Sequence, residues 1–345
     1  MKFGQYILRR FLLGIFVIIG LSILIFVISR VIPGDPARLA LGPRAPVEVV
    51  EQLRQELHLD KPLPVQYFIW LNNVIHGDFG RSLVTRRPVV EDIKEYLPAT
   101  LELVFFTAII MIFFALTLGA SAARNKDRWV DSLIRIFAYV GVSIPAFVLA
   151  VFFILIFGYA WPILPVIGRL SSHFNIPRVT GFMILDAFFA GKINIAWDAL
   201  KHLILPAFAL ALGPAFQEAR ITRASMVDNM YKDYIFAERG YGFSEKIIMF
   251  KYLLKPSLIP TVSVMGMDIA ATIGNAFLVE LIFNWPGISR YGINAMLYKD
   301  LNAISGTVLI IGLVFVLTNI VVDIIVSFLD PSIRLRGNKE GENGK

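Results

Sequence analysis

The chain alternates between long apolar runs and polar connecting segments. Six apolar runs each exceed about 20 residues, the length that a helix needs to cross a hydrocarbon core of roughly 30 Å. They cover residues 9–30, 99–123, 133–157, 202–226, 260–283 and 304–329. A spanning helix satisfies its own backbone hydrogen bonds, and the short alternating segments of a membrane barrel are absent from this sequence. The pattern therefore predicts an all-α polytopic membrane protein with six transmembrane helices.

The polar segments predict how the chain is divided. Residues 31–98 open with the helix-stopping sequence Pro33-Gly34-Asp35-Pro36 and then carry two short amphipathic helical patterns, around 47–57 and 65–75. With 8 basic and 9 acidic side chains, this segment is expected to be a small, solvated helical domain outside the membrane. Its Asp35 and Asp78 fit turn or helix-cap positions better than ligand sites. We expect the N-terminal end and first span in residues 1–30, this external domain in 31–98, and a core of five spans in 99–345.

Two features interrupt the core. Ser143-Ile144-Pro145 lies inside the third run, where proline predicts a kinked helix with freed backbone carbonyls. Residues 161–201 are rich in glycine, proline and aromatic side chains, and their apolar piece Phe182–Phe189 is too short to cross a membrane. We expect this segment to lie on the outer interface or to dip into it.

Composition and charge agree with this picture and orient it. Hydrophobic residues make up 57% of the chain and charged residues 17%, against about 25% charged in soluble proteins. Basic residues number 17 in the 74 residues of segments 1–10, 124–131, 219–258 and 330–345, but 14 in the 128 residues of the alternate segments 31–98, 161–201 and 285–303. The positive-inside rule then predicts that both termini and the loop at about 227–259 are cytoplasmic. The net charge of +7 follows this distribution and argues against a bound nucleic acid, while the lack of cysteine excludes disulfides.

The polar stretch from Asp233 to Pro260 is patterned rather than a plain linker. Lys246, Lys251 and Lys255 favour an amphipathic helix that rests on anionic lipid. Ala237 and the glycines Gly240 and Gly242 favour a second interpretation, because small residues let a helix approach closely to another protein. The residues leave both interpretations open.

Asp268, Thr272 and Asn275 are spaced to share one face of the fifth span. A charge near the bilayer centre costs about 2.5–3.5 kcal/mol, so this face should meet a cavity or a partner helix. It is either a polar wall of a translocation pathway or a hydrogen-bonded packing contact. A single such acid is meagre for an ion-coupled secondary transporter, which stays as an alternative of another class. A membrane scaffold without transport activity is a further alternative.

Sequence motifs for catalysis are missing. The chain has no phosphate-binding loop of the G-x-x-x-x-G-K-[ST] type, and its four histidines lack metal-ligand spacing. We therefore expect a chain that is not an enzyme and that binds no metal.

Motifs along the whole chain resemble those of permease subunits of ATP-binding-cassette (ABC) importers of the dipeptide, oligopeptide and nickel class. The resemblance is carried in order by Arg30-Val31-Ile32-Pro33-Gly34-Asp35-Pro36, Leu59–Tyr67, Gly77–Ser82, Leu97–Leu103, Ser143-Ile144-Pro145, Arg223–Met226 and the signature Glu280-x-x-Phe283-x-Trp285-Pro286-Gly287. It implies the six-span type I importer permease fold, with a small helical external domain after the first span, in the cell membrane.

The resemblance also implies partners and site residues. Partners would be a second homologous permease, two cytoplasmic ATPase subunits that hold the ATP and Mg, an external substrate-binding protein and membrane lipid, with no cofactor in this chain. A coupling helix would contact the ATPase through Asp233, Tyr234, Ala237, Glu238, Arg239, Gly240 and Gly242. The Glu238-Arg239-Gly240-Tyr241 stretch departs from the family pattern and leaves the partner's identity open. Candidates for the translocation pathway are Ser143, Asp268, Thr272, Asn275 and Glu280. Peptides are the expected substrate, with oligosaccharides or nickel chelates as alternatives.

Overall fold

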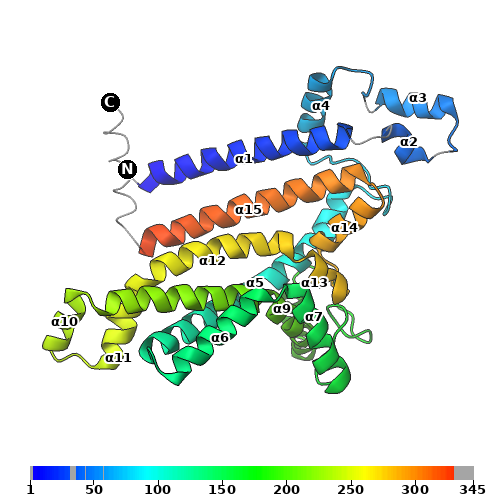
Figure 1. Ribbon diagram of the computed structural model, residues 1–345. Helices are drawn as coiled ribbons and strands as arrows, with labels where there is room; N and C mark the ends of the chain where they lie inside the picture. Colours follow the sequence, from blue (N-terminus) through cyan, green and yellow to red (C-terminus); the bar gives the residue numbers. More distant parts are fainter. Residues whose placement is uncertain (1–2, 32–35, 43, 57, 330–345) are drawn as a thin grey trace, which may run out of the picture.

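The computed structural model describes residues 3–31, 36–42, 44–56 and 58–329, and the regular secondary structure of this part is helical apart from one isolated bridge between Arg81 and Pro88 (Figure 1). In chain order the elements are α1 (Phe3–Val31), α2 (Pro36–Leu41), α3 (Val47–Glu56), α4 (Leu63–Ile75), α5 (Val89–Arg124), α6 (Trp129–Ser143), α7 (Ala146–Phe153), the π-helical η1 (Ile154–Ala160), α8 (Met183–Phe189), α9 (Ile193–Met230), α10 (Asp233–Gly240), α11 (Glu245–Ile247), the π-helical η2 (Ile248–Leu254), α12 (Lys255–Asn275), α13 (Phe277–Ile282), α14 (Ile288–Leu297) and α15 (Leu301–Leu329). The prediction for Asp35 lies outside the described residues.

The helices confirm a polytopic membrane protein. Five stretches of described helix are long and apolar enough to cross a membrane, and a bent pair of helices raises the number to six. These stretches belong to α1, α5, α9, the continuous helix from Glu245 to Asn275, and α15; the bent pair is α6 with α7 and η1.

The third predicted span is broken where the proline falls. α6 ends at Ser143, α7 begins at Ala146, and the two axes differ by 102°. The carbonyl of Pro145 accepts from the N–H groups of Val148 and Leu149 at 3.0 and 3.2 Å, so a new helix starts at this residue. The predicted kink is confirmed, although it is large enough to turn one run into two helices.

Several helices differ in length from the apolar runs. α5 begins at Val89, ten residues before the predicted start, because Val89 and Ile93 form a buried face that packs on α14 and α15. α9 begins at Ile193 rather than at 202. The fifth run ends early, since α12 stops at Asn275 and α13 follows as a separate helix. Apolar length therefore located these spans but missed polar extensions and a break.

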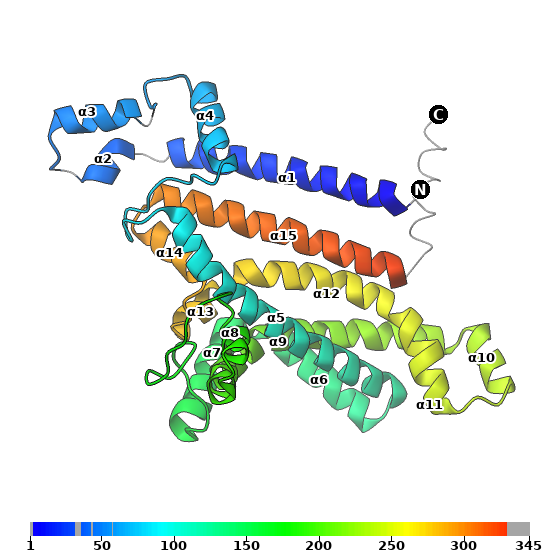
Figure 2. The ribbon, with the colours of Figure 1, turned by 180° about the vertical axis from the view of Figure 1, so that it is seen from behind.

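The long helices are arranged in a row. α1, α15 and α12 lie side by side, and α9 and α5 pack against each other and against α12 (Figures 1 and 2). Arg10 of α1 pairs with Asp323 of α15 at 3.0 Å. One end of the row carries α2, α3, α4 and α14, and the opposite end carries α10 and α11. The described ends of the chain, at the start of α1 and the end of α15, lie at the α10 end.

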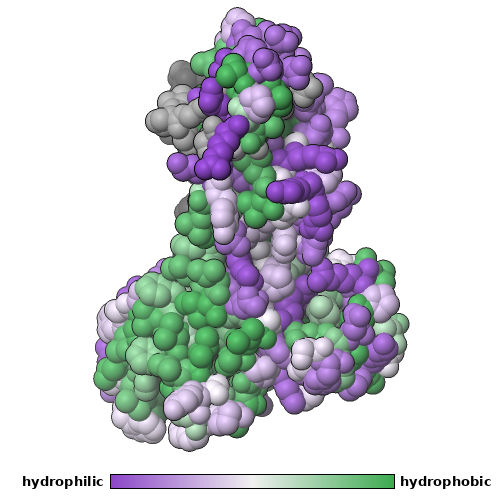
Figure 3. All heavy atoms as spheres, turned by 90° about the vertical axis from the view of Figure 1, so that its right-hand side faces the viewer, coloured by the Kyte–Doolittle hydropathy of each residue, from purple (hydrophilic) through white to green (hydrophobic). Residues whose placement is uncertain are grey.

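The outer surface of several helices is apolar. On α1, Phe16 is 75% exposed, and on α7 and η1 the side chains of Phe152, Leu155 and Tyr159 are exposed. Figure 3 looks onto the end that carries α2–α4, where hydrophilic residues gather above and a continuous hydrophobic patch covers the lower left. Such large apolar surfaces are expected where a chain meets lipid or another subunit.

Candidate functional site

α10 projects from one end of the molecule and is fastened by a single buried side chain. Ile235 is fully buried and packs in a cluster with Met226 of α9, Ile248 and Leu253 of η2, and Ala123 of α5. This contact joins α10 to α9 and to η2, which continues into α12.

The remaining surface of α10 is exposed and partly aromatic. Tyr234, Phe236 and Ala237 are exposed, and Tyr241, directly after the helix, is 80% exposed. Exposed aromatic side chains on a polar projection are typical of a surface that contacts another protein.

The turn after α10 is closed within the chain. Arg239 donates to the Glu245 carboxylate at 2.9 Å, the Glu238 carbonyl accepts from the N–H of Phe243, and Gly242 adopts a φ of +80°. A positive φ is strained for residues with a side chain, so Gly242 supports this turn. Six of the seven residues predicted for coupling, from Asp233 to Gly240, lie in α10, and Gly242 lies two residues after its end. Their role in coupling stays a prediction.

A second group of candidates lines a hollow between α7, α9 and α12. Two adjoining cavities, of about 240 and 370 Å³, share Asp268 with Ala146, Leu210 and Pro214. The larger cavity is also lined by Thr272 and Asn275, so the predicted shared face of these three residues is confirmed. Thr272 donates to the Asp268 carbonyl at 2.7 Å, whereas Oδ2 of Asp268 is buried without a hydrogen-bond partner. Their part in a translocation pathway stays a prediction.

Sequence reasoning missed Glu218. Glu218 is fully buried in α9, and both of its carboxylate oxygens lack a hydrogen-bond partner. Its position within the predicted fourth span, 202–226, was the available signal.

Two other pathway candidates lie elsewhere. Ser143 does not line either cavity; its hydroxyl donates to the Tyr139 carbonyl one turn back in α6. Glu280 is fully buried, and its carboxylate accepts from the Thr100 hydroxyl of α5 and, at 2.8 Å, from the N–H of Arg290. These contacts make Glu280 an anchor between α13, α14 and α5. Any part of Ser143 or Glu280 in a translocation pathway stays a prediction.

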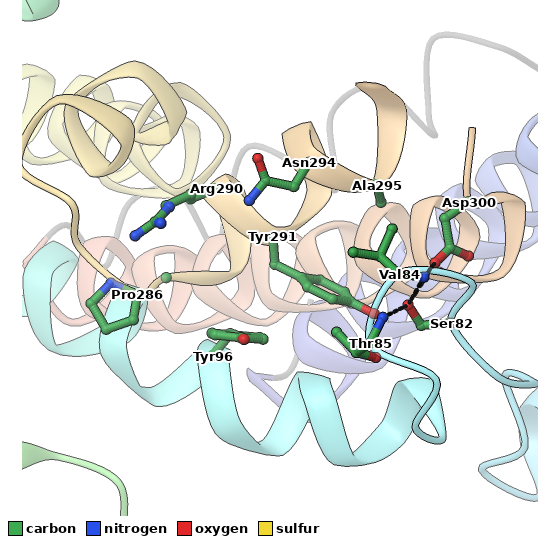
Figure 4. Close-up of a pocket in the computed structure, with 11 residues that line it drawn as sticks. Ser82, Val84, Thr85, Tyr96, Pro286, Arg290, Tyr291, Asn294, Ala295 and Asp300 are labelled. Carbon is green, nitrogen blue, oxygen red and sulfur yellow. Dashed lines mark hydrogen bonds between the residues drawn. The ribbon is translucent and has the colours of Figure 1, made fainter. Parts of the chain in front are cut away.

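A third hollow, of about 240 Å³, lies at the end of the molecule opposite α10 (Figure 4). Tyr96 of α5 and Tyr291 of α14 stack there with ring centroids 5.2 Å apart, and burial, together with the hydrogen bond to Asp92, raises the pKa of Tyr291. Asp300 closes the hollow by accepting from Ser82 and from the backbone of the following turn. The Gly77–Ser82 motif pointed to this segment but not to the pocket that it builds.

A helical polytopic chain with a hollow between its spanning helices and an exposed helix between two of them defines a membrane transport subunit. The chain belongs to the family described as "binding-protein-dependent transport system inner membrane component", which matches residues 115–335, while the N-terminal component of the same kind of system matches residues 3–104. It is thus an inner-membrane permease of a binding-protein-dependent ABC importer, as the motifs indicated.

The curated relatives agree over nearly their whole length. The chain is 38% identical to the dipeptide transport system permease protein DppB of Alkalihalophilus pseudofirmus, over 95% of this chain and 99% of that protein. It is 38% identical to the probable D,D-dipeptide transport system permease protein DdpB of Escherichia coli, over 94% and 96%. The glutathione transport system permease protein GsiC of Escherichia coli is 34% identical over 96% and 99%.

Proposed function

We propose that the chain is the permease subunit of an ATP-driven importer of di- and oligopeptides and forms half of its translocation pathway. The observation that carries this proposal is the 38% identity to two dipeptide permeases over more than nine-tenths of the chain. The relatives named for glutathione, a tripeptide, support the same substrate class.

The energy for transport enters through partner subunits. The sequence lacks a phosphate-binding loop, so ATP and Mg bind to two cytoplasmic ATPase subunits and not to this chain. α10 docks on one of them with its exposed face around Tyr234, Phe236 and Ala237. The buried Ile235 contact then carries the movement of the ATPase into α9 and η2.

Charge distribution and surface chemistry support the remaining assembly. The concentration of basic residues around α10 and at both chain ends supports a cytoplasmic position for them. The opposite end, with α2–α4 and the segment 161–201, receives the external binding protein. A second, homologous permease covers part of the exposed apolar surface and completes the pathway.

Transport proceeds by alternating access. Closure of the ATPase subunits moves α10, and α9 and α12 re-pack with it. The cavities beside Asp268 lie between these helices and the bend at Pro145, so re-packing opens them to one side of the membrane and then to the other.

The direct test is uptake by the complete transporter. The chain is co-expressed with its neighbouring permease, ATPase and binding-protein genes, and the purified complex is reconstituted in proteoliposomes. Radiolabelled dipeptide is expected to accumulate only with ATP and the binding protein. Competition by an oligosaccharide or a nickel chelate, but not by peptides, would refute the peptide assignment, and uptake driven by a proton or sodium gradient without ATP would refute the class.

The docking role of α10 is tested at Ala237. Ala237→Trp places a large side chain on the exposed face and is expected to lower peptide uptake and ATPase association at least about tenfold, which corresponds to about 1.4 kcal/mol of binding. Ala237→Ser keeps the residue small and is the matched control. Wild-type uptake and ATPase association in the tryptophan variant would show that α10 does not dock through this face.

A further inference from the structure

The cavities between α7, α9 and α12 are lined by one acid and, among the described residues, by no base. Asp268 is the one ionisable residue in their linings, and no basic side chain of the described residues lines either cavity. The other polar lining residues are neutral: Gln217, Thr272 and Asn275. The walls are otherwise apolar or small, so a charge inside them is poorly screened.

Glu218 adds a second acid behind the wall. It is fully buried, its two oxygens lack hydrogen-bond partners, and it lies near enough to Asp268 for the two carboxylates to interact electrostatically. One turn further along α9, the Thr222 hydroxyl meets the Thr261 hydroxyl of α12 at 2.9 Å, which holds the two helices together at this level.

Neighbouring arginines of α9 are engaged elsewhere. Arg223 forms a bidentate ion pair with Asp131 of α6, and Arg220 lies over the Tyr139 ring with its guanidinium carbon 5.8 Å from the centroid. The acids therefore lack a cationic partner among the described residues. A buried unpaired carboxylate is unfavourable, and a cation that enters the cavity relieves that penalty.

The chemistry of the lining selects the kind of cation. The Asp268 carboxylate and the Gln217 amide oxygen line the same cavity and offer separate acceptors, which suits the N–H donors of an ammonium group. Ca²⁺ takes six to eight oxygen ligands, and Mg²⁺ requires an octahedral set. The described residues contain no group of three His, Cys, Asp or Glu side chains that could hold a metal.

We propose that Asp268, with Glu218 behind it, forms a site for the protonated amino group of a peptide as it passes between α9 and α12. The inference rests on the proposed peptide transport and adds the part of the substrate that the permease itself recognises. Asp268 contacts the ammonium group, and Glu218 lies behind it in the helix interface.

The test uses the complete transporter in proteoliposomes, with the same binding protein throughout. Uptake is measured for three forms of one dipeptide: unmodified, C-terminally amidated and N-acetylated. Asp268→Asn is expected to lower uptake of the first two about tenfold, because both keep the ammonium group, and to change uptake of the acetylated form little. Asp268→Glu is expected to restore most of the lost uptake. Since every preparation shares the binding protein, a changed preference belongs to the permease.

Ser263→Ala, on α12 but outside both cavity linings, is the control and should transport like the wild type. Wild-type uptake in Asp268→Asn, equal losses for all three peptides, or failure of Asp268→Glu to restore uptake would overturn the inference. If uptake of the acetylated peptide is below detection in every preparation, the inference is judged from the unmodified and amidated peptides alone. Their uptake should then fall in Asp268→Asn and recover in Asp268→Glu. A wild-type transporter that carries no peptide counts against the proposed function instead.

Discussion

At the scale of single residues, the Glu280–Gly287 signature is a structural lock in this chain. The Glu280 carboxylate is held by the Thr100 hydroxyl and the Arg290 N–H, while Trp285 donates from Nε1 to the Ala99 carbonyl at 2.9 Å. Each of these bonds joins α13, α14 or the turn between them to α5 or to each other. The motif therefore fixes the short helices after the broken fifth span.

Gly287 tests this lock because it has no room for a side chain. A Cβ there would lie 2.1 Å from a Glu280 carboxylate oxygen. Gly287→Ala is expected to destabilise the protein by about 1–3 kcal/mol through overpacking, seen as a lower Tm of the purified permease. Gly274→Ala is the control, since a Cβ at Gly274 meets nothing within 4 Å. Equal Tm values for both variants would contradict the lock.

Residue spacing predicted the contacts that lie on one helix, but it could not predict contacts between helices. The shared face of Asp268, Thr272 and Asn275 followed from helical periodicity, which depends on one helix alone. The burial of Glu218 depends on other helices that pack against α9, which spacing within α9 does not encode. The same reason explains Glu280, whose partners Thr100 and Arg290 come from other helices.

At the scale of elements, α10 combines an anchored face with an exposed one. Ile235 lies in the cluster with Met226 and Ile248, whereas its neighbour Phe236 is 54% exposed. The exposed ion pair of Arg239 with Glu245 closes the turn after the helix, and exposed pairs contribute little stability. Packing of Ile235 is therefore what holds α10 in place.

Adjacent substitutions separate the two faces. Ile235→Ala is expected to reduce stability by about 2–4 kcal/mol, because it leaves a cavity in the cluster, and so to lower the Tm of the isolated permease. Phe236→Ala should change the free energy of unfolding by no more than about 0.5 kcal/mol, so that the Tm stays near that of the wild type, and should weaken ATPase association instead. Pull-down of the ATPase subunit and thermal unfolding measure the two effects. A loss of stability in Phe236→Ala with unchanged association would reverse the assignment of faces.

At the scale of the whole molecule, apolar length predicted the helical class and the number of spans but not where every helix ends. α5 starts ten residues early, since Val89 and Ile93 pack on α14 and α15 rather than lie in lipid. α6 and α7 meet at 102°, an angle that a proline permits but that neighbouring helices set. Hydropathy measures the environment of a segment, and these bounds depend on contacts between segments.

The proposed orientation places α10 in the cytoplasm and α4 outside. The chain contains no cysteine, so a single introduced cysteine reports on its own position. Asn73→Cys, exposed on α4, should react with a membrane-impermeant maleimide in intact spheroplasts, whereas Ala237→Cys, exposed on α10, should react only after permeabilisation. The two sites lie at opposite ends of the row of long helices, which separates them across the bilayer. Labelling of Ala237→Cys in intact spheroplasts would show that α10 lies outside the cell. It would thereby contradict the proposed orientation and the docking of α10 on a cytoplasmic ATPase.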